Sequence, residues 1–234
     1  MTTPHPEKRH LASRTAGEVA AAAPLVLLVP VGSCEQHGPH LPLDTDTRVA
    51  VAVAERVAAR RAEVVVAPAV AYGSSGEHQG FAGTLSIGTA ALRTVLIELG
   101  RSAFPAAGAG AFASLVFVNG HGGNHEALGE AVDVLVGEGR PVTAWWPSIP
   151  GGDAHAGRTE TSLLLAIAGD VVGPDRPVGE TRPLGELLGS LRSGGVAAVA
   201  PNGVLGDATG ASPEEGEALL AALVDDLAAR LPVS

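Results

Sequence analysis

Apolar runs and segments of helical periodicity alternate along the chain. Four short runs, rich in valine and bounded by glycine, proline or charged residues, have the length of buried strands. These predicted strands are Pro24–Val31, Glu63–Val70, Ser114–Val118 and Pro141–Trp146. Apolar residues at helical spacing predict helices over Thr47–Arg61, Thr89–Ala103, Glu126–Val136, Thr159–Ala168, Leu184–Leu191 and Ser212–Leu231. The alternation predicts a three-layer α/β/α fold with a mostly parallel central sheet.

One domain accounts for the whole chain of 234 residues. This length suits a single large domain with a substantial core, and neither an internal repeat nor a long linker divides it. Pro105–Gly110 ends a predicted helix, and Ala71–Gly88 and Ser148–Gly157 are predicted loops. We therefore expect a single domain over residues 1–234, with residues 1–23 as a loosely ordered N-terminal segment.

Composition excludes several classes of protein. The chain is 46% hydrophobic and 17% charged, which argues against disorder. Its formal net charge of -10 argues against nucleic acid or an anionic membrane as the partner. Cys34 is the single cysteine, so no internal disulfide forms, and a reducing, cytoplasmic location is expected.

The N-terminal region superficially resembles a signal peptide. Lys8, Arg9 and Arg14 precede the apolar run Val19–Val31. Two prolines interrupt that run, and it leads directly into the candidate site residues described next. Cleavage would remove the strand that positions those residues, so we interpret the run as a retained strand.

The segment after the first predicted strand contains the highest concentration of candidate metal-binding side chains. Glu35, His37 and Asp46 combine carboxylate oxygen with imidazole nitrogen, which suits a divalent first-row metal. Extended spacing places Glu35 and His37 on the same side of the chain, so Cys34 and Gln36 are expected to point the other way.

A polar loop followed by a helix cap is the alternative for this segment. Thr45 or Asp46 would then lie near the N-cap of the helix that follows, and Asp44 or Asp46 could be only that cap. His40 and Asp44, taken singly, are interpreted as supporting or surface groups.

A second motif follows the third strand. His121 lies in the glycine-rich turn Asn119–Asn124, where glycines on both sides let the backbone turn sharply and approach an ion. We therefore interpret His121 as a ligand. His125 lies one step into the following helix and lacks this argument.

A third motif, Asp153–Ser162, follows the fourth strand. Glu160 lies in the first turn of a helix, where it either compensates the helix dipole or binds a metal. His155 lies in the preceding loop and is placed for proton transfer.

Two other features are candidates for the substrate pocket. Glu77 and His78 lie in the loop after the second strand. One of the adjacent residues Trp145 and Trp146, with Trp146 favoured, is expected to form an apolar wall beside the site, although core packing explains a tryptophan equally well.

Four stretches together resemble the creatininase family of metal-dependent amidohydrolases. They are Glu35-Gln-His37-Gly-Pro-His-Leu-Pro-Leu, Thr45-Asp46-Thr47, Asn119-Gly-His121-Gly-Gly-Asn124 and His155-Ala-Gly-x-x-Glu160-Thr-Ser162. Tyr72–Gln79 and Gly194–Gly210 further resemble the mycofactocin-system branch of that family. Its members are peptidases that remove the modified C-terminal Val-Tyr dipeptide from a small radical-modified precursor peptide.

The resemblance implies a creatininase-like α/β fold holding one or two divalent metal ions per subunit. The implied ligands are Glu35, Asp46 and His121 for one ion, and His37 with a bridging Asp46 for the other. Creatininase itself supplies another glutamate two residues after the motif's histidine, where this chain has Gly123. Glu160 is the candidate that completes the second site. Zinc, manganese and iron all suit this nitrogen and oxygen ligand set.

The ligand set implies hydrolysis of a peptide or amide C–N bond. A bound metal would polarise the carbonyl and lower the pKa of water toward ~7. The leaving amine needs a proton, which His155 could supply, or Glu160 if it is not a ligand. The alternatives are hydrolysis of a small cyclic amide or formamide, and a non-catalytic metal-binding scaffold. Gly123 argues against creatininase activity proper.

The expected partners are a small modified peptide and further copies of the chain. Low charge density would leave apolar patches on a monomer. Creatininase-like enzymes assemble as rings, so the resemblance implies a homo-oligomer, with a hexamer favoured.

Overall fold

A four-stranded parallel sheet forms the centre of the protein. The computed structural model describes residues 6–105 and 110–232. In them the strand order is β2-β1-β3-β4, and all three neighbouring pairs are parallel. The strands are β1 (Leu25–Val31), β2 (Val64–Val66), β3 (Phe112–Asn119) and β4 (Val142–Trp145). The mostly parallel sheet predicted from the apolar runs is confirmed.

The second strand is shorter than the predicted Glu63–Val70. Pro68 has no N–H to donate, so regular pairing cannot continue through it. The N–H groups of Ala67 and Val70 still donate to β1, at 2.8 and 2.9 Å from the carbonyl oxygens of Leu28 and Pro30. The segment therefore follows β1 without remaining a regular strand.

Both faces of the sheet are buried, which explains the uninterrupted apolar runs. In β1, Val26 and Leu28 belong to one core cluster, whereas Leu25, Leu27 and Val29 belong to the other. Because successive side chains of a strand point to opposite faces, a strand between two helical layers needs apolar residues at every position.

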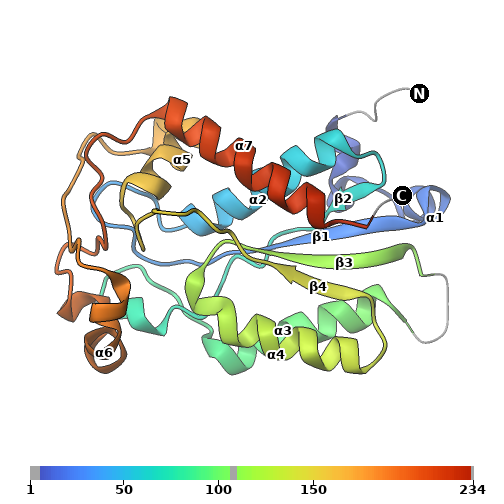
Figure 1. Cartoon of the computed structure of the whole chain (residues 1–234). Helices are drawn as coiled ribbons and strands as arrows, with labels where there is room; N and C mark the ends of the chain where they lie inside the picture. The colour runs from blue at the N-terminus through green and yellow to red at the C-terminus, as the bar shows by residue number, and fades with distance from the viewer. Residues whose placement is uncertain (1–5, 106–109, 233–234) are drawn as a thin grey trace.

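Helices cover both faces of the sheet, as Figure 1 shows. One layer consists of α2 (Thr45–Arg60), α5 (Arg158–Ala168) and α7 (Pro213–Arg230), and the other of α3 (Gly88–Ala103) and α4 (His125–Gly137). The predicted three-layer α/β/α architecture is confirmed. Helix α6 (Leu184–Gly194) lies apart from both layers, beyond the carboxyl ends of the strands (Figure 1).

The N-terminal segment contains more structure than the sequence predicts. Residues 6–13 form two short 3-10 turns, and α1 (Ala16–Ala22) follows. Thr15 and Glu18 form a reciprocal capping box at the start of α1, while Leu11 and Val19 pack against the core. Residues 1–5 and 233–234, and most of the predicted break Pro105–Gly110, lie outside the described residues. None of the helices described here has the length and apolar character needed to cross a bilayer.

The close packing of α7 on α5 depends on Gly216. A Cβ atom at this position would collide with the backbone carbonyl of Ser162. We expect Gly216→Ala to destabilise the fold by about 2 kcal/mol, because overpacking forces the two helices apart. Gly129→Ala is the matched control, since a Cβ there meets nothing within 4 Å in α4 and alanine favours a helix by up to about 1 kcal/mol. Chemical denaturation of both variants would measure the difference, and equal stabilities would contradict the packing argument.

Candidate metal centre and active site

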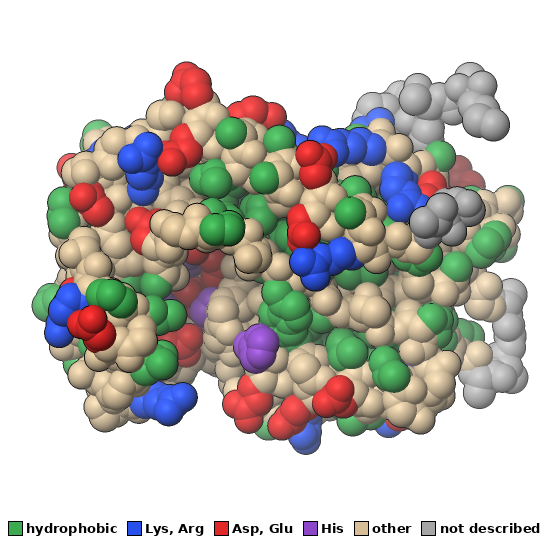
Figure 2. All heavy atoms as spheres, viewed as in Figure 1, with side chains coloured by type: hydrophobic (Ala, Val, Ile, Leu, Met, Phe, Trp, Pro, Cys, Tyr) green, Lys and Arg blue, Asp and Glu red, His purple; other side chains and the backbone are tan. Residues whose placement is uncertain are grey.

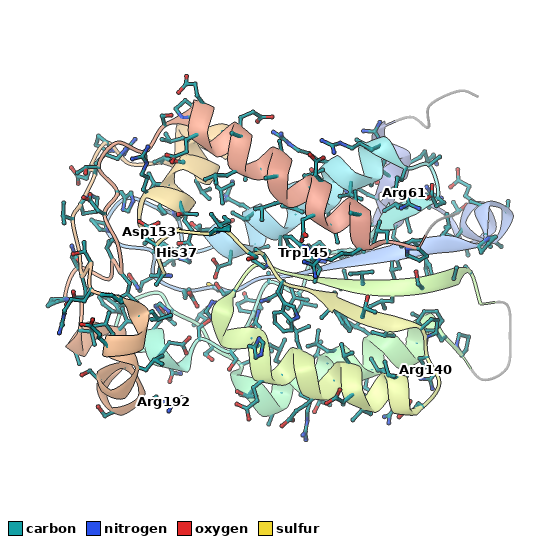
Figure 3. The ribbon with its side chains drawn as sticks, in the orientation of Figure 1. His37, Arg61, Arg140, Trp145, Asp153 and Arg192 are labelled. Atoms are coloured by element: carbon teal, nitrogen blue, oxygen red, sulfur yellow. The ribbon has the colours of Figure 1, made fainter. Side chains whose placement is uncertain are left out.

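The predicted site residues come from the carboxyl ends of three different strands. Glu35 and His37 follow β1, His121 follows β3, and His155 and Glu160 follow β4. Because the strands are parallel, these ends meet at one edge of the sheet. Figure 3 shows His37 and Asp153 beyond this edge, with Trp145 further back at the end of β4.

Glu35 is a fully buried carboxylate that lacks the partners burial normally requires. It is 0% exposed, and neither oxygen has a hydrogen-bond partner among the described residues, although the imidazoles of His121 and His78 lie near, at 3.1 and 3.3 Å. Burial raises the pKa of Glu35 to about 8, against the opposing charge of His121. An unsatisfied buried carboxylate is costly, and a cation bound to both oxygens would remove that cost. The residues therefore fit a metal ion.

Asp46 connects the two halves of the site. Its Oδ1 atom lies 3.1 Å from His37 Nε2, and its Oδ2 atom lies 3.2 Å from His121 Nδ1. Ser33 Oγ donates a hydrogen bond of 2.7 Å to Oδ2 and fixes the rotamer. Burial alone would raise the pKa of Asp46, but His37 and His121 hold it well below its usual range. One carboxylate thus faces both histidines.

Asp46 lies in the first turn of α2 and is not its cap. The N-cap residue is Asp44, and its side chain makes no capping hydrogen bond. Thr45 and Asp46 thus lie beside the N-cap, as expected, and of the two cap candidates Asp44 and Asp46 it is Asp44 that takes the position. Thr45 instead donates its hydroxyl to the carbonyl of Pro42, at 2.7 Å, which leaves the Asp46 carboxylate to the site.

Backbone carbonyls orient the two histidines that face Asp46. His37 Nδ1 lies 3.1 Å from the carbonyl oxygen of Glu35, and His121 Nε2 lies 3.1 Å from that of Ser74. A carbonyl only accepts, so each of these nitrogens carries the proton and the other ring nitrogen faces Asp46. This arrangement is typical of metal-binding histidines.

The same carboxylates shift the pKa values of these histidines. Burial alone would lower both values, but Asp46 raises the pKa of His37 to about 10, and Glu35 and Asp46 raise that of His121 to about 9. The surrounding negative charge thus favours a positive charge between the ligands.

Glu160 reaches the site from the first turn of α5. Its Oε2 atom lies 3.8 Å from His37 Nε2 and 3.9 Å from His155 Nδ1. Oε2 also accepts the backbone N–H of Ala156, which has a φ of 52°. Asp153 holds the preceding loop by accepting the N–H groups of Arg158 and Thr159 at 2.6 and 2.9 Å.

Within residues 6–105 and 110–232, three groups of side chains have ligand atoms close enough to share an ion. The groups are Glu35, Asp46 and His121; His37, His155 and Glu160; and Glu35, His78 and His155. The first is the set that the sequence assigns to one ion. The second holds His37 and Glu160, with His155 in place of the Asp46 that the resemblance implies for the other ion.

The site opens into a cavity of about 540 Å³. Figure 2 shows acidic and histidine side chains at the bottom of a hollow on this face. Leucines of α6, namely Leu184, Leu188 and Leu191, line the opposite wall. A neighbouring cavity of about 880 Å³ shares Ala154, Leu184 and Leu205 with it. The two adjacent cavities are large enough for several residues of a peptide.

The structure brings the two predicted pocket residues of the 74–84 loop to the site. Glu77 lines the cavity, with its Oε1 atom 3.7 Å from His121 Nε2. His78 is buried, with its Nε2 atom 3.3 Å from Glu35 Oε1. His78 is therefore much nearer to the predicted metal ligands than a residue of an outer pocket wall.

The tryptophans do not form the expected wall. Trp146 packs its ring 4.5 Å from that of the exposed His125 and is absent from the lining of both cavities. Trp145 is in the core and donates its Nε1–H to Asp226 at 2.7 Å. The leucines of α6 take that place, and nothing in the sequence pattern beyond the amphipathic character of this helix pointed to them.

Gln36 points into the site, contrary to the expectation from extended spacing. Its amide nitrogen lies 2.9 Å from His78 Nδ1 and 3.1 Å from His155 Nε2. Strand β1 ends at Val31, so strict alternation of side chains no longer applies at position 36. Cys34 does point elsewhere, toward the carbonyl of Gly83.

His40 and Asp44 take supporting and surface positions. His40 is buried and its Nε2 atom lies 2.8 Å from Thr161 Oγ1. Asp44 accepts a hydrogen bond from Arg48 on the surface of α2, at 2.7 Å. Neither residue belongs to a group able to share an ion among the described residues.

The fold and the site together define a metal-dependent hydrolase that acts on C–N bonds. A family model described as creatinine amidohydrolase matches residues 11–231. The chain belongs to the creatininase family.

Relatives of two kinds are similar to this chain. The mycofactocin precursor peptide peptidase of Mycolicibacterium smegmatis is 54% identical over 94% of this chain and 90% of its own length. The creatinine amidohydrolase of Pseudomonas putida is 32% identical over 89% of each chain.

Solved structures share the fold. A creatininase described with Mn superposes with a TM-score of 0.73 at 27% identity, covering 94% of this chain and 96% of its own. A creatininase mutant described as Zn-Zn type gives a TM-score of 0.72 at 27% identity, with the same coverage of both chains. The predicted creatininase-like fold is confirmed.

Proposed function

We propose that this protein hydrolyses the mycofactocin precursor peptide and releases its modified C-terminal Val-Tyr dipeptide. The observation that carries the proposal is the 54% identity over 94% of the chain with a peptidase of that name. The two adjacent cavities support it, because a peptide needs space on both sides of the bond that is cut.

The proposed metal ligands form two sets that share Asp46. Glu35, Asp46 and His121 would hold one divalent ion, and His37, Asp46 and Glu160 a second one. When bound, such an ion polarises the amide carbonyl and makes water more acidic. Zinc, iron and manganese all suit these ligands.

His155 is the proposed proton-transfer residue. It is 7% exposed, lines the cavity and has its Nδ1 atom 3.8 Å from Glu35 Oε1. On the cavity wall it would be within reach of both the attacking water and the leaving amine of a bound peptide. Proton transfer by a positioned imidazole contributes about 10²–10⁴-fold to such reactions.

The remaining candidate residues would contact the substrate. Glu77 and the leucines of α6 line the cavity, where the leucines would contact the apolar side chains of the dipeptide. Hydrolysis of creatinine is a weaker candidate, because the glutamate that creatininase supplies at position 123 is a glycine here and identity to that enzyme is only 32%.

The full-length chain, loaded separately with Zn²⁺, Fe²⁺ or Mn²⁺, tests this function. We expect the radical-modified precursor peptide to lose its C-terminal dipeptide, detected by mass spectrometry, and a chelator to stop the reaction. Creatinine and a formamide serve as comparison substrates. Turnover of creatinine without peptide cleavage would establish the small-amide alternative, whereas bound metal with no hydrolysis would indicate a scaffold.

Glu160→Gln separates the two roles open to Glu160. If Glu160 completes the second metal set, the variant should retain roughly one ion per subunit instead of two, with a milder loss of activity than variants of the first set. Metal content per subunit and peptide hydrolysis would be measured together. Full metal content with lost activity would show that Glu160 transfers protons instead.

The state of the protein in the cell is proposed on the same basis. We expect a cytoplasmic homo-oligomer, with a hexamer favoured. Exposed apolar residues on α3 and α4, namely Val95, Leu99, Val134 and Val136, support association. Light scattering at micromolar concentration would test this, and a single-subunit mass would refute it. The net charge of -10 gives no support to nucleic acid or an anionic membrane as a partner.

A further inference from the structure

Gln36 is a buried amide whose orientation is set by two backbone groups. Its Oε1 atom lies 2.9 Å from the backbone nitrogen of Gly38, which can only donate. Its Nε2 atom lies 3.0 Å from the carbonyl oxygen of Gly203, which can only accept. The amide therefore has one orientation, with its NH₂ group toward His78 and His155.

This orientation fixes the tautomer of His78. The NH₂ group has two hydrogens, and one goes to the Gly203 carbonyl. The other goes to His78 Nδ1 at 2.9 Å, so that nitrogen must accept and cannot carry a proton. Neutral His78 then carries its proton on Nε2, the atom that lies 3.3 Å from Glu35 Oε1.

His155 has the opposite arrangement. Its Nε2 atom lies 2.9 Å from the backbone carbonyl oxygen of Gln36 and 3.1 Å from the Gln36 amide nitrogen, whose two hydrogens already go to Gly203 and His78, so this Nε2 carries the proton and donates it to the carbonyl. The lone pair of Nδ1 is left facing Glu35 Oε1 and Glu160 Oε2, at 3.8 and 3.9 Å. Residue 36 thus orders both rings, one through its side chain and the other through its backbone.

The surroundings of Gln36 are shaped to its side chain. Gly203 has a φ of +77°, and a Cβ atom there would collide with Gln36 Oε1. The rings of His78 and His155 lie side by side, with centroids 4.4 Å apart. A side chain that is 5% exposed and bonded on both ends has little freedom to release either histidine.

We propose that Gln36 is a positioning residue that holds His78 and His155 in opposite tautomers. The metal ligands then face an N–H group from His78 and a free nitrogen from His155. The inference rests on the proposed function, because it assigns the two rings different tasks in amide hydrolysis.

The different tasks of the two rings follow from the protonation of the nitrogens that face the ligands, His155 Nδ1 and His78 Nε2. His155 Nδ1 takes a proton from the attacking water as the oxygen of that water bonds to the carbonyl carbon. When the C–N bond breaks, the same proton passes to the leaving nitrogen. His78 already carries a proton on its facing nitrogen, so it cannot act as this base, and instead directs that N–H toward the carboxylate of Glu35 at 3.3 Å.

Solid-state ¹⁵N NMR of the zinc-loaded, full-length protein with ¹⁵N-labelled histidine tests the tautomers directly. His78→Gln and His155→Gln identify the two sets of signals by their loss. We expect an unprotonated Nδ1 for His78 and a protonated Nε2 for His155. A protonated Nδ1 on His78 would overturn the proposal, whether or not any variant of Gln36 folds.

Gln36→Met tests the positioning role in catalysis, since methionine has a similar size and no amide. We expect a loss in kcat of about 10- to 100-fold, little change in KM, unchanged zinc content, and a His78 signal that indicates mixed tautomers. Gln79→Met is the matched control, because Gln79 is exposed in the loop that carries His78.

Two results with Gln36→Met would contradict the proposal. An unchanged kcat would show that the tautomers do not depend on the amide, and loss of zinc would show that Gln36 supports the ligands themselves. If the wild-type protein cleaves no peptide, the proposed function fails, while the NMR measurement still decides the tautomers.

Discussion

Asp46→Ala is expected to empty both metal sets and to lower peptide hydrolysis by at least about 100-fold. Asp46 is the carboxylate that faces both His37 and His121, at 3.1 and 3.2 Å. Removing one partner from a buried charged cluster costs about 3–5 kcal/mol, and here the loss affects two ligand sets together. Metal content per subunit and hydrolysis rate would be measured on the same preparation.

Asp44→Ala is the matched control for Asp46→Ala. Asp44 lies two positions earlier and pairs with Arg48 on the surface, where such a pair is worth about 0.5 kcal/mol. Its replacement should leave metal content and turnover nearly unchanged. If Asp46→Ala keeps full metal and near-normal turnover, Asp46 does not bridge the two sets.

Gly123→Ala is expected to produce the second largest effect. A Cβ atom at this position would collide with the carbonyl oxygen of Ser74 and with His121 Nε2, and would lie 2.6 Å from Glu77 Oε1. The Ser74 carbonyl is the group that orients His121. Pushing His121 and the Ser74 carbonyl apart by even about 1 Å would displace His121, a proposed ligand. Misplacement of this size costs about 100-fold in rate.

Gly122→Ala tests whether the loss expected for Gly123→Ala is specific to position 123. A Cβ atom at Gly122 meets nothing within 4 Å, so this variant should keep its metal and its activity. Zinc titration and hydrolysis assays would compare the two variants. Equal behaviour of Gly122→Ala and Gly123→Ala would mean that the space around His121 adapts, and would remove the steric argument against a side chain at position 123.

The architecture could be predicted from the sequence because apolar runs and turn residues are local. Glycine-rich or polar turns directly follow β1 and β3, and these turns carry Glu35, His37 and His121. In a parallel sheet the ends of strands converge, so chain order was enough to bring these residues together. The rule fails where the strand stops, which is why the direction of Gln36 was predicted incorrectly.

Other features of the site depend on contacts that no local pattern contains. The apolar wall comes from α6, whose leucines read from sequence like those of any amphipathic helix packed on a core. The nearness of His78 to Glu35 depends on how the loop after β2 folds back over the sheet. The backbone carbonyl at position 36 orients His155, and the carbonyl at position 203 orients the Gln36 amide that faces His78; the place of these carbonyls is not encoded by any local pattern.

Because the site residues come from the ends of three strands, the amount of folded protein in the cell should depend on the metal supply. A chain that has not yet paired β1 with both β3 and the loop that leads into α5 has no complete place for an ion. Metal would therefore bind the folded form only and add to its stability in proportion to the logarithm of the available metal concentration. A cell short of metal would hold more unfolded chain, so proteolysis would adjust the amount of this protein to the metal supply.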